Sequence, residues 1–202
     1  MTIEIELKVR LDDIEPVKER LSVFGDYCRS YEKSDSYWRP LPEADYVSVP
    51  PSGVRVRREH GQSADGAAYE SVMVTFKTKE ISGGIEVNDE REFTVSDAAL
   101  FEELLRGLGM HLAIRKEKKG RAWNIPAQAA NLPDAAGQFP VLAELSLVTG
   151  LGWFLELEIL AADDNAQTVQ ECRRRLLTLL AELEIPADRI ESRPYTAMLA
   201  AL

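Results

Sequence analysis

The sequence has little of what disulfide scaffolds, zinc sites and membrane spans require. Its two cysteines, Cys28 and Cys172, are too few and too far apart for a disulfide framework or a zinc site. No apolar run approaches the roughly 20 residues that cross a bilayer. Charges interrupt the first ten residues from Glu4 onward, unlike a signal peptide. We therefore expect a cytoplasmic protein with reduced cysteines and no membrane partner.

An excess of basic residues is also missing. The formal net charge of −10 argues against a general nucleic-acid binder, because such affinity comes from summed Lys and Arg charge. The two histidines, His60 in a polar loop and His111 beside a helix-to-strand link, are not expected to be catalytic. With 202 residues, of which 45% are hydrophobic and 29% charged, the chain fits one globular domain spanning residues 1–202.

Hydrophobic periodicity predicts helices separated by strands. We expect helices from Asp12 or Asp13 to Phe24, from Ser96 to about Gly109, and from Asn165 to Glu184, with a short one opened by Pro194. The first ten residues alternate apolar and charged side chains, which is typical of a strand. Further strands are expected at residues 34–39, 54–59, 71–79, 85–95, 114–125, 142–148 and 153–160.

Charges of one sign lie two residues apart on several of these strands, and so share a strand face. The pairs are Glu4 with Glu6, Arg55 with Arg57, Lys77 with Lys79, Glu90 with Glu92, and Glu156 with Glu158. A solvated outer face would favour mixed signs, because neighbouring like charges repel. The grouping favours an α+β fold in which an eight-stranded antiparallel β-barrel turns its charged face inward and carries helices on its outside.

A lumen that holds carboxylates and cations together suits one kind of ligand. Carboxylate oxygens bind hard cations such as Mg²⁺ or Mn²⁺, while Lys and Arg neutralise phosphate oxygens. A divalent metal with a triphosphate satisfies both groups. A plain structural barrel is the alternative, and it does not explain the like-sign pairs.

The order of motifs along the chain resembles the CYTH, or triphosphate tunnel metalloenzyme, family, which includes class IV adenylate cyclases and thiamine triphosphatases. The chain opens with the family's ExExK motif as Glu4, Glu6 and Lys8. The other matching segments, in order, are SDSYW, VRVR, TFKTK, EREF, RKEKKGRAW and GLGWFLELE. The match extends over nearly the whole chain.

The resemblance implies a role for each charged group. Glu4, Glu6, Glu156 and Glu158 hold or position metal, and Lys8 and Lys77 are the catalytic side chains. Glu90 and Glu92 lie on the tunnel wall as ligands or orienters. The triphosphate is bound by Lys8, Arg55, Arg57, Lys77, Lys116, Lys118 and Arg121.

The chain departs from the family pattern at two positions. Gly120 falls where the family usually has a basic residue, which leaves the placement of Arg121 open. Ser146 stands where the family usually has an Asp before the GLG turn, and Glu144 supplies that carboxylate only if its strand shifts. The Ser146 departure bears on the number of metals.

The resemblance leaves several activities open. A class IV adenylate cyclase converts ATP to cyclic AMP and pyrophosphate, a triphosphatase hydrolyses the terminal phosphate of an organic or inorganic triphosphate, and a noncatalytic sensor only binds. The ending ESRPYTAML is similar to that of cyclase-like members, although Tyr195 and Leu199 are equally explained by helix packing. A homodimer is a further expectation.

Overall fold

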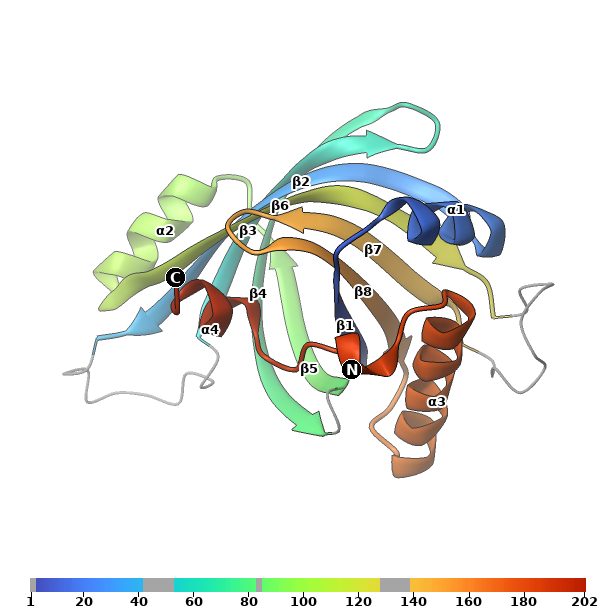
Figure 1. Ribbon diagram of the computed structural model, residues 1–202. Helices are drawn as coiled ribbons and strands as arrows, with labels where there is room; N and C mark the ends of the chain where they lie inside the picture. Colours follow the sequence, from blue (N-terminus) through green and yellow to red (C-terminus); the bar gives the residue numbers. More distant parts are fainter. Residues whose placement is uncertain (1–2, 42–52, 83–84, 128–138) are drawn as a thin grey trace.

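The structure, a computed structural model, describes residues 3–41, 53–82, 85–127 and 139–202. Within these ranges eight antiparallel strands form a closed barrel in the order β1-β5-β4-β3-β2-β6-β7-β8 (Figure 1). The strands are β1 (Ile3–Leu11), β2 (Asp26–Pro40), β3 (Val54–Ser63), β4 (Ala68–Ser82), β5 (Ile85–Thr94), β6 (Met110–Ile125), β7 (Val141–Val148) and β8 (Gly152–Ala161). The predicted antiparallel barrel is confirmed.

The apolar face of β1 points outward, as its alternation requires. Ile5, Leu7 and Val9 are fully buried on that outer face, although they lie outside the lumen. They are covered by α3 (Ala166–Glu182) and α1 (Glu15–Phe24), which pack on one side of the barrel. Burial against these helices leaves the charged side chains of β1 to face the interior.

A second helix, α2 (Ala98–Gly107), covers the opposite side of the barrel over β2, β3 and β4. Its Glu102 accepts hydrogen bonds from Ser36 Oγ (2.7 Å) and Arg58 Nη1 (3.0 Å) on the outer face. Ser36 Oγ in turn accepts from Trp38 Nε1 (3.1 Å). The outward-facing residues of the SDSYW segment, Ser36 and Trp38, therefore bind α2, and the alternate residues face the lumen.

The C-terminal segment crosses the barrel after the 3₁₀ turn η2 (Ala187–Arg189) and ends in α4 (Tyr195–Leu199) (Figure 1). It is joined to β1 by a bridge between Val9 and Ile190 and by Glu191 N–H donating to Lys8 O (2.8 Å). Tyr195 and Met198 of α4 pack against Phe154 and the β7–β8 turn. The end of the chain is thus tied to the strand that carries the ExExK motif.

Several predicted boundaries were wrong. Ile14 occupies the N-cap position of α1 without a side-chain cap, while the predicted Asp13 accepts from Glu15 N–H (3.1 Å) through its carboxylate. Asp97, rather than Ser96, caps α2 by accepting from two backbone N–H groups. The strand predicted at residues 34–39 is the 15-residue β2. β2 pairs with β3 and with β6 along most of its length, and many of its residues are polar. Hydrophobic alternation therefore could not reveal how long the strand is.

Candidate functional site

A charged cavity of about 700 Å³ occupies the barrel lumen. Equal numbers of acidic and basic side chains, eight of each, line it in the described residues. The acidic set is Glu4, Glu6, Glu59, Glu86, Glu92, Glu144, Glu156 and Glu158. The basic set is Lys8, Arg29, Lys33, Arg39, Arg55, Arg57, Lys116 and Lys118. This balance suits a ligand that brings charge of both signs, as a metal-bound polyanion does.

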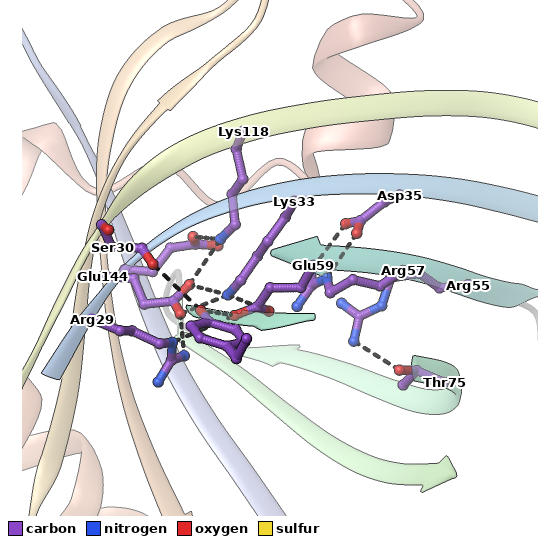
Figure 2. Close-up of polar contacts among 12 residues, drawn as sticks. Arg29, Ser30, Lys33, Asp35, Arg55, Arg57, Glu59, Thr75, Lys118 and Glu144 are labelled. Carbon is purple, nitrogen blue, oxygen red and sulfur yellow. Dashed lines mark hydrogen bonds and ion pairs between the residues drawn. The ribbon is translucent and has the colours of Figure 1, made fainter. Parts of the chain in front are cut away.

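Asp35 organises two of the cations. Its carboxylate accepts from Arg57 Nε (2.7 Å) and Arg57 Nη2 (2.9 Å), and lies 3.0 Å from Lys116 Nζ (Figure 2 shows the Arg57 pair). Asp35 is fully buried, and burial raises its pKa. The charges of Arg57 and Lys116 outweigh that effect and hold the pKa well below the usual range. The ionised carboxylate on β2 therefore holds one cation on each neighbouring strand, Arg57 on β3 and Lys116 on β6.

Glu144 forms a second network with three cations (Figure 2). It accepts from Lys33 Nζ (2.6 and 2.9 Å), Arg29 Nη2 (2.9 Å) and Lys118 Nζ (3.1 Å). Burial raises its pKa, but Lys33 and Lys118 bring it well below the usual range. Lys118 also pairs with Glu156. Glu144 and Glu156 are thus held by cations in this structure.

Lys33 is the lysine of this network whose pKa is lowered. Burial lowers its pKa to about 8, because the attraction of Glu144 is offset by the neighbouring charges of Lys118 and Arg57. Its Nζ lies 3.6 Å from Glu59 and 4.1 Å from the centroid of the Tyr31 ring. The ammonium therefore keeps its proton at pH 7 and loses it as pH rises through about 8.

Glu92 orients Arg55 at the rim of the lumen. Arg55 Nη2 donates to Thr75 Oγ1 (2.9 Å) and to Glu92 Oε1 (3.3 Å), and Thr75 Oγ1 donates to the same carboxylate oxygen (2.7 Å). This is the orienting role expected for a carboxylate of the tunnel wall.

Carboxylates gather on the wall formed by β5, β1 and β8. Glu86, Glu6 and Glu158 are register partners across these three strands, and Glu4 on the next rung pairs with Asn88. Asn88 is fully buried and donates through Nδ2 to Glu4 Oε1 (2.8 Å), while its Oδ1 has no hydrogen-bond partner among the side chains that the structure describes. We call Glu4, Glu6, Glu86 and Glu158 the acidic wall. In the described part of the chain, no three acidic, His or Cys side chains converge closely enough to hold an ion alone.

Most of the predicted site residues face the lumen. Those that line the cavity are Glu4, Glu6, Lys8, Arg55, Arg57, Glu92, Lys116, Lys118, Glu144, Glu156 and Glu158. The side chains of Lys77, Lys79 and Glu90 lie outside the described residues, although the backbones of Lys77 and Glu90 are paired. Arg121 is a wrong prediction. It is exposed on the outer face of β6, because the alternation that turns Lys116 and Lys118 inward turns Arg121 outward.

The Gly120 departure has a structural explanation, which involves its neighbour Ser146. Ser146 is fully buried and pairs in register with Gly120, which itself pairs with Tyr31. A Cβ at position 120 would meet Leu145 O at 2.3 Å, so the backbones are too close there for the basic residue of the family pattern. Glu144, on the same face of β7, lines the lumen, where Lys33, Arg29 and Lys118 hold its carboxylate; that it supplies the missing carboxylate stays a prediction.

Sequence reasoning missed several luminal residues. Those on β2 are Arg29, Lys33, Asp35 and Arg39; the others are Glu59, Glu86, Asn88 and Tyr195. Their spacing of two along β2 was a usable signal. The intervening residues of β2, such as Ser30, Glu32 and Ser34, are also polar, so the inward face was not marked by hydrophobicity.

The barrel with its inward charges belongs to a known family. Residues 2–195 match the CYTH domain, and the chain is a member of the CYTH family. It is 24% identical over 194 residues to a Methanocaldococcus jannaschii protein named "Putative adenylate cyclase MJ0240", with 96% of each chain covered.

Solved structures share the fold at low sequence identity. PH1819 from Pyrococcus horikoshii superposes with a TM-score of 0.71 at 20% identity, covering 98% of both chains. HpAC1 from Hippeastrum, described as a "putative adenylyl cyclase" with a dominant triphosphatase activity, gives 0.61 at 14% identity, covering 100% of this chain and 96% of its own. Among the described residues, no helix has the length and apolar character to cross a membrane.

Proposed function

We propose that this chain, acting as a single domain, is a metal-dependent enzyme that binds a triphosphate in its lumen and transfers phosphoryl groups. The first candidate reaction is that of a class IV adenylate cyclase, from ATP to cyclic AMP and pyrophosphate. The observation that carries the proposal is the segregation of charge within one cavity. The acidic wall stands beside Lys8, and the cations fixed by Asp35 and Glu92 line the same space.

The donor set of the acidic wall fits a hard divalent cation. All its donors are oxygens, and Asn88 Oδ1 is a buried acceptor that no described residue satisfies. Mg²⁺ is usually held by one or two carboxylates with water and substrate phosphate, so a closed protein cage is not required. Glu4, Glu6 and Glu158 are the residues proposed to hold it. Bound there, Mg²⁺ or Mn²⁺ neutralises charge that builds on phosphate oxygens.

Glu156 has a different part in this proposal. Its carboxylate pairs with Lys118 and faces Lys8 in register, so it positions cations that bind phosphate. Lys8 lies 3.7 Å from Glu86 and reaches the boundary between the acidic wall and the basic side chains. Lys8 is therefore placed to contact a phosphate oxygen that the metal also contacts, and to stabilise charge during transfer.

The cyclase reaction also needs a surface for the base. Tyr37 and Ile114 are register partners that line the cavity next to Arg55. An aromatic ring beside an aliphatic side chain offers a stacking surface for adenine. With the base there, the triphosphate extends past Arg55 and Arg57 toward Lys116, and the ribose 3′-hydroxyl attacks the α-phosphorus.

Hydrolysis of the terminal phosphate is the second candidate. The luminal charges serve it equally, and the Hippeastrum relative of the same fold is described with dominant triphosphatase activity. In that reaction water attacks the terminal phosphorus, and no base-binding surface is needed. Inorganic triphosphate is then as good a substrate as ATP.

Product analysis separates these reactions. The protein is incubated with ATP, thiamine triphosphate or inorganic triphosphate in Mg²⁺ or Mn²⁺, and both cyclic AMP and phosphate are measured. Cyclic AMP from ATP, lost in a Glu4→Gln, Glu6→Gln variant, supports the cyclase. Phosphate release alone supports the triphosphatase. Binding without turnover of any substrate contradicts both and leaves a noncatalytic sensor.

A further inference from the structure

Tyr195 is a buried luminal residue that belongs to none of the charged networks. It opens α4, is 7% exposed, and lines the cavity together with its neighbours Pro194 and Thr196. The segment before it is hydrogen-bonded to Lys8 of β1 through Glu191. Its place in the lumen is therefore set by the strand that carries Glu4, Glu6 and Lys8.

Three side chains hold the Tyr195 ring. Phe154 packs edge-to-face against it, with centroids 5.1 Å apart and an interplanar angle of 86°. Lys8 Nζ lies 4.7 Å and Lys116 Nζ 4.9 Å from the ring centroid. The two ammonium groups are attracted by the π-face of the ring. The orientation of the hydroxyl is thus fixed before any ligand binds.

The hydroxyl itself has no acceptor among the residues that the structure describes. Tyr195 Oη is buried and makes no hydrogen bond within the described part of the chain. Burial raises its pKa well above the usual value for tyrosine, and the negative charge of Glu156 raises it further. The group therefore keeps its proton and is a donor throughout the physiological range. Leaving a buried donor unpaired is unfavourable, so a partner from outside the chain is the physical expectation.

We propose that Tyr195 Oη donates a hydrogen bond to a phosphate oxygen of the bound triphosphate, making Tyr195 a substrate-binding residue. The proposal rests on the proposed function, because Lys8 and Lys116, which hold the ring, are the side chains assigned there to phosphate. A phosphate oxygen between these two cations lies next to the tyrosine ring. The nearby carboxylates are ionised and can only accept hydrogen bonds, so they cannot bind a phosphate oxygen. The hydroxyl of Tyr195 is neutral and can donate to one.

The test is Tyr195→Phe, which removes the hydroxyl and keeps the ring that packs on Phe154. Binding of inorganic triphosphate is measured by calorimetry in EDTA, where turnover does not occur. Because a hydrogen bond to a charged group is at stake, the affinity of Tyr195→Phe is expected to fall about tenfold or more. Tyr27→Phe is the matched control, since Tyr27 lies at the exposed start of β2, outside the cavity.

Stability of the ligand-free variants separates binding from packing. Tyr195→Phe is expected to melt at or above the wild-type temperature, because it removes an unpaired buried donor. It is expected to show a smaller stabilisation by triphosphate, measured against its own ligand-free value. Wild-type affinity in Tyr195→Phe overturns the inference alone. So does a loss of ligand-free stability with the triphosphate-induced shift unchanged, because that pattern is purely structural. Absence of triphosphate binding by the wild type, both in EDTA and with Mn²⁺, overturns the proposed function together with the inference.

Discussion

Asp35 and Arg57 form a two-point pair across β2 and β3, with Oδ1 2.7 Å from Nε and Oδ2 2.9 Å from Nη2. The carboxylate fixes the plane of the guanidinium as well as its position. Lys116 on β6 shares the same carboxylate at 3.0 Å. Three strands of the barrel are therefore joined inside the lumen by a residue that contacts two proposed phosphate ligands.

Asp35→Asn is expected to destabilise the protein at neutral pH by about 3 kcal/mol, because it leaves the charges of Arg57 and Lys116 without their buried partner. The folded pKa of Asp35 is depressed below its ordinary value of 3.8. Its stabilising contribution is therefore present above about pH 4 and is lost as pH falls through the lower folded pKa. Urea unfolding at pH 7 and pH 3 measures this: the gap between wild type and variant should narrow at pH 3.

Asp188→Asn, on the exposed 3₁₀ turn, is the control for that experiment. It should unfold like the wild type at both pH values. An Asp35→Asn variant that is as stable as Asp188→Asn at neutral pH contradicts the organising role of Asp35.

Inward and outward arginines should behave differently. Arg57→Ala is expected to weaken triphosphate binding at least about 30-fold, because it removes a charge-assisted contact in a water-poor lumen. Arg121→Ala should leave affinity unchanged, since Arg121 lies on the outer face of β6. Calorimetry with inorganic triphosphate compares the two. Equal losses in both variants would mean that the binding surface is not the lumen.

The sequence predicted the barrel well because charge and hydrophobicity alternate on β1, β3 and β8. On these strands the like-sign pairs Glu4 and Glu6, and Arg55 and Arg57, indicated the inward face. Prediction failed on β2, where both faces are polar and no hydrophobic stripe gives the direction. The inward placement of Asp35 depends on pairing with Arg57, which only the assembled sheet reveals.

Two other residues were not placed from the sequence. The resemblance included Arg121 among the phosphate ligands but left its side of the strand open because of Gly120, and the alternation that turns Lys116 and Lys118 inward turns Arg121 outward. The ending that contains Tyr195 was left open between a resemblance to cyclase-like members and simple helix packing, and no ligand contact was predicted. Its sequence position says nothing of the path by which the C-terminal segment crosses the barrel to reach Lys8 and Lys116. The homodimer stays a prediction.

Lys33 should make triphosphate binding depend on pH near 8. With a pKa of about 8 it loses its charge as pH rises, so affinity is expected to fall above that value. In the absence of ligand, the contribution of Lys33 to the free energy of unfolding changes in the opposite direction with pH. The unfolded chain binds the extra proton between pH 8 and the ordinary 10.5, so this residue's contribution to stability improves as pH rises through that window.

Calorimetry at pH 9, in buffers of different ionisation enthalpy, measures the proton uptake that accompanies triphosphate binding. Lys33→Arg keeps its charge at that pH and is expected to abolish the part of the uptake that Lys33 contributes. The same uptake in wild type and Lys33→Arg would assign the proton to another group.

The acidic wall should bind Mn²⁺ more tightly when triphosphate is present, since the described residues alone offer the ion too few convergent ligands. Glu6→Gln is expected to lower Mn²⁺ affinity at least about tenfold. Asn88→Ala should lower it less, because it removes only the hydrogen bond that orients Glu4. Electron paramagnetic resonance of free Mn²⁺ measures both. Glu103→Gln, an exposed change on α2, should match the wild type.

A crystal structure of the protein with Mn²⁺ and inorganic triphosphate tests the central claim most directly. The account predicts triphosphate density in the lumen, in contact with Arg57 and Lys116. It also predicts an anomalous Mn²⁺ peak between that density and Glu4, Glu6 and Glu158. Triphosphate bound on the outer surface, or a lumen that keeps its ion pairs and excludes both ligands at saturating concentration, would contradict it.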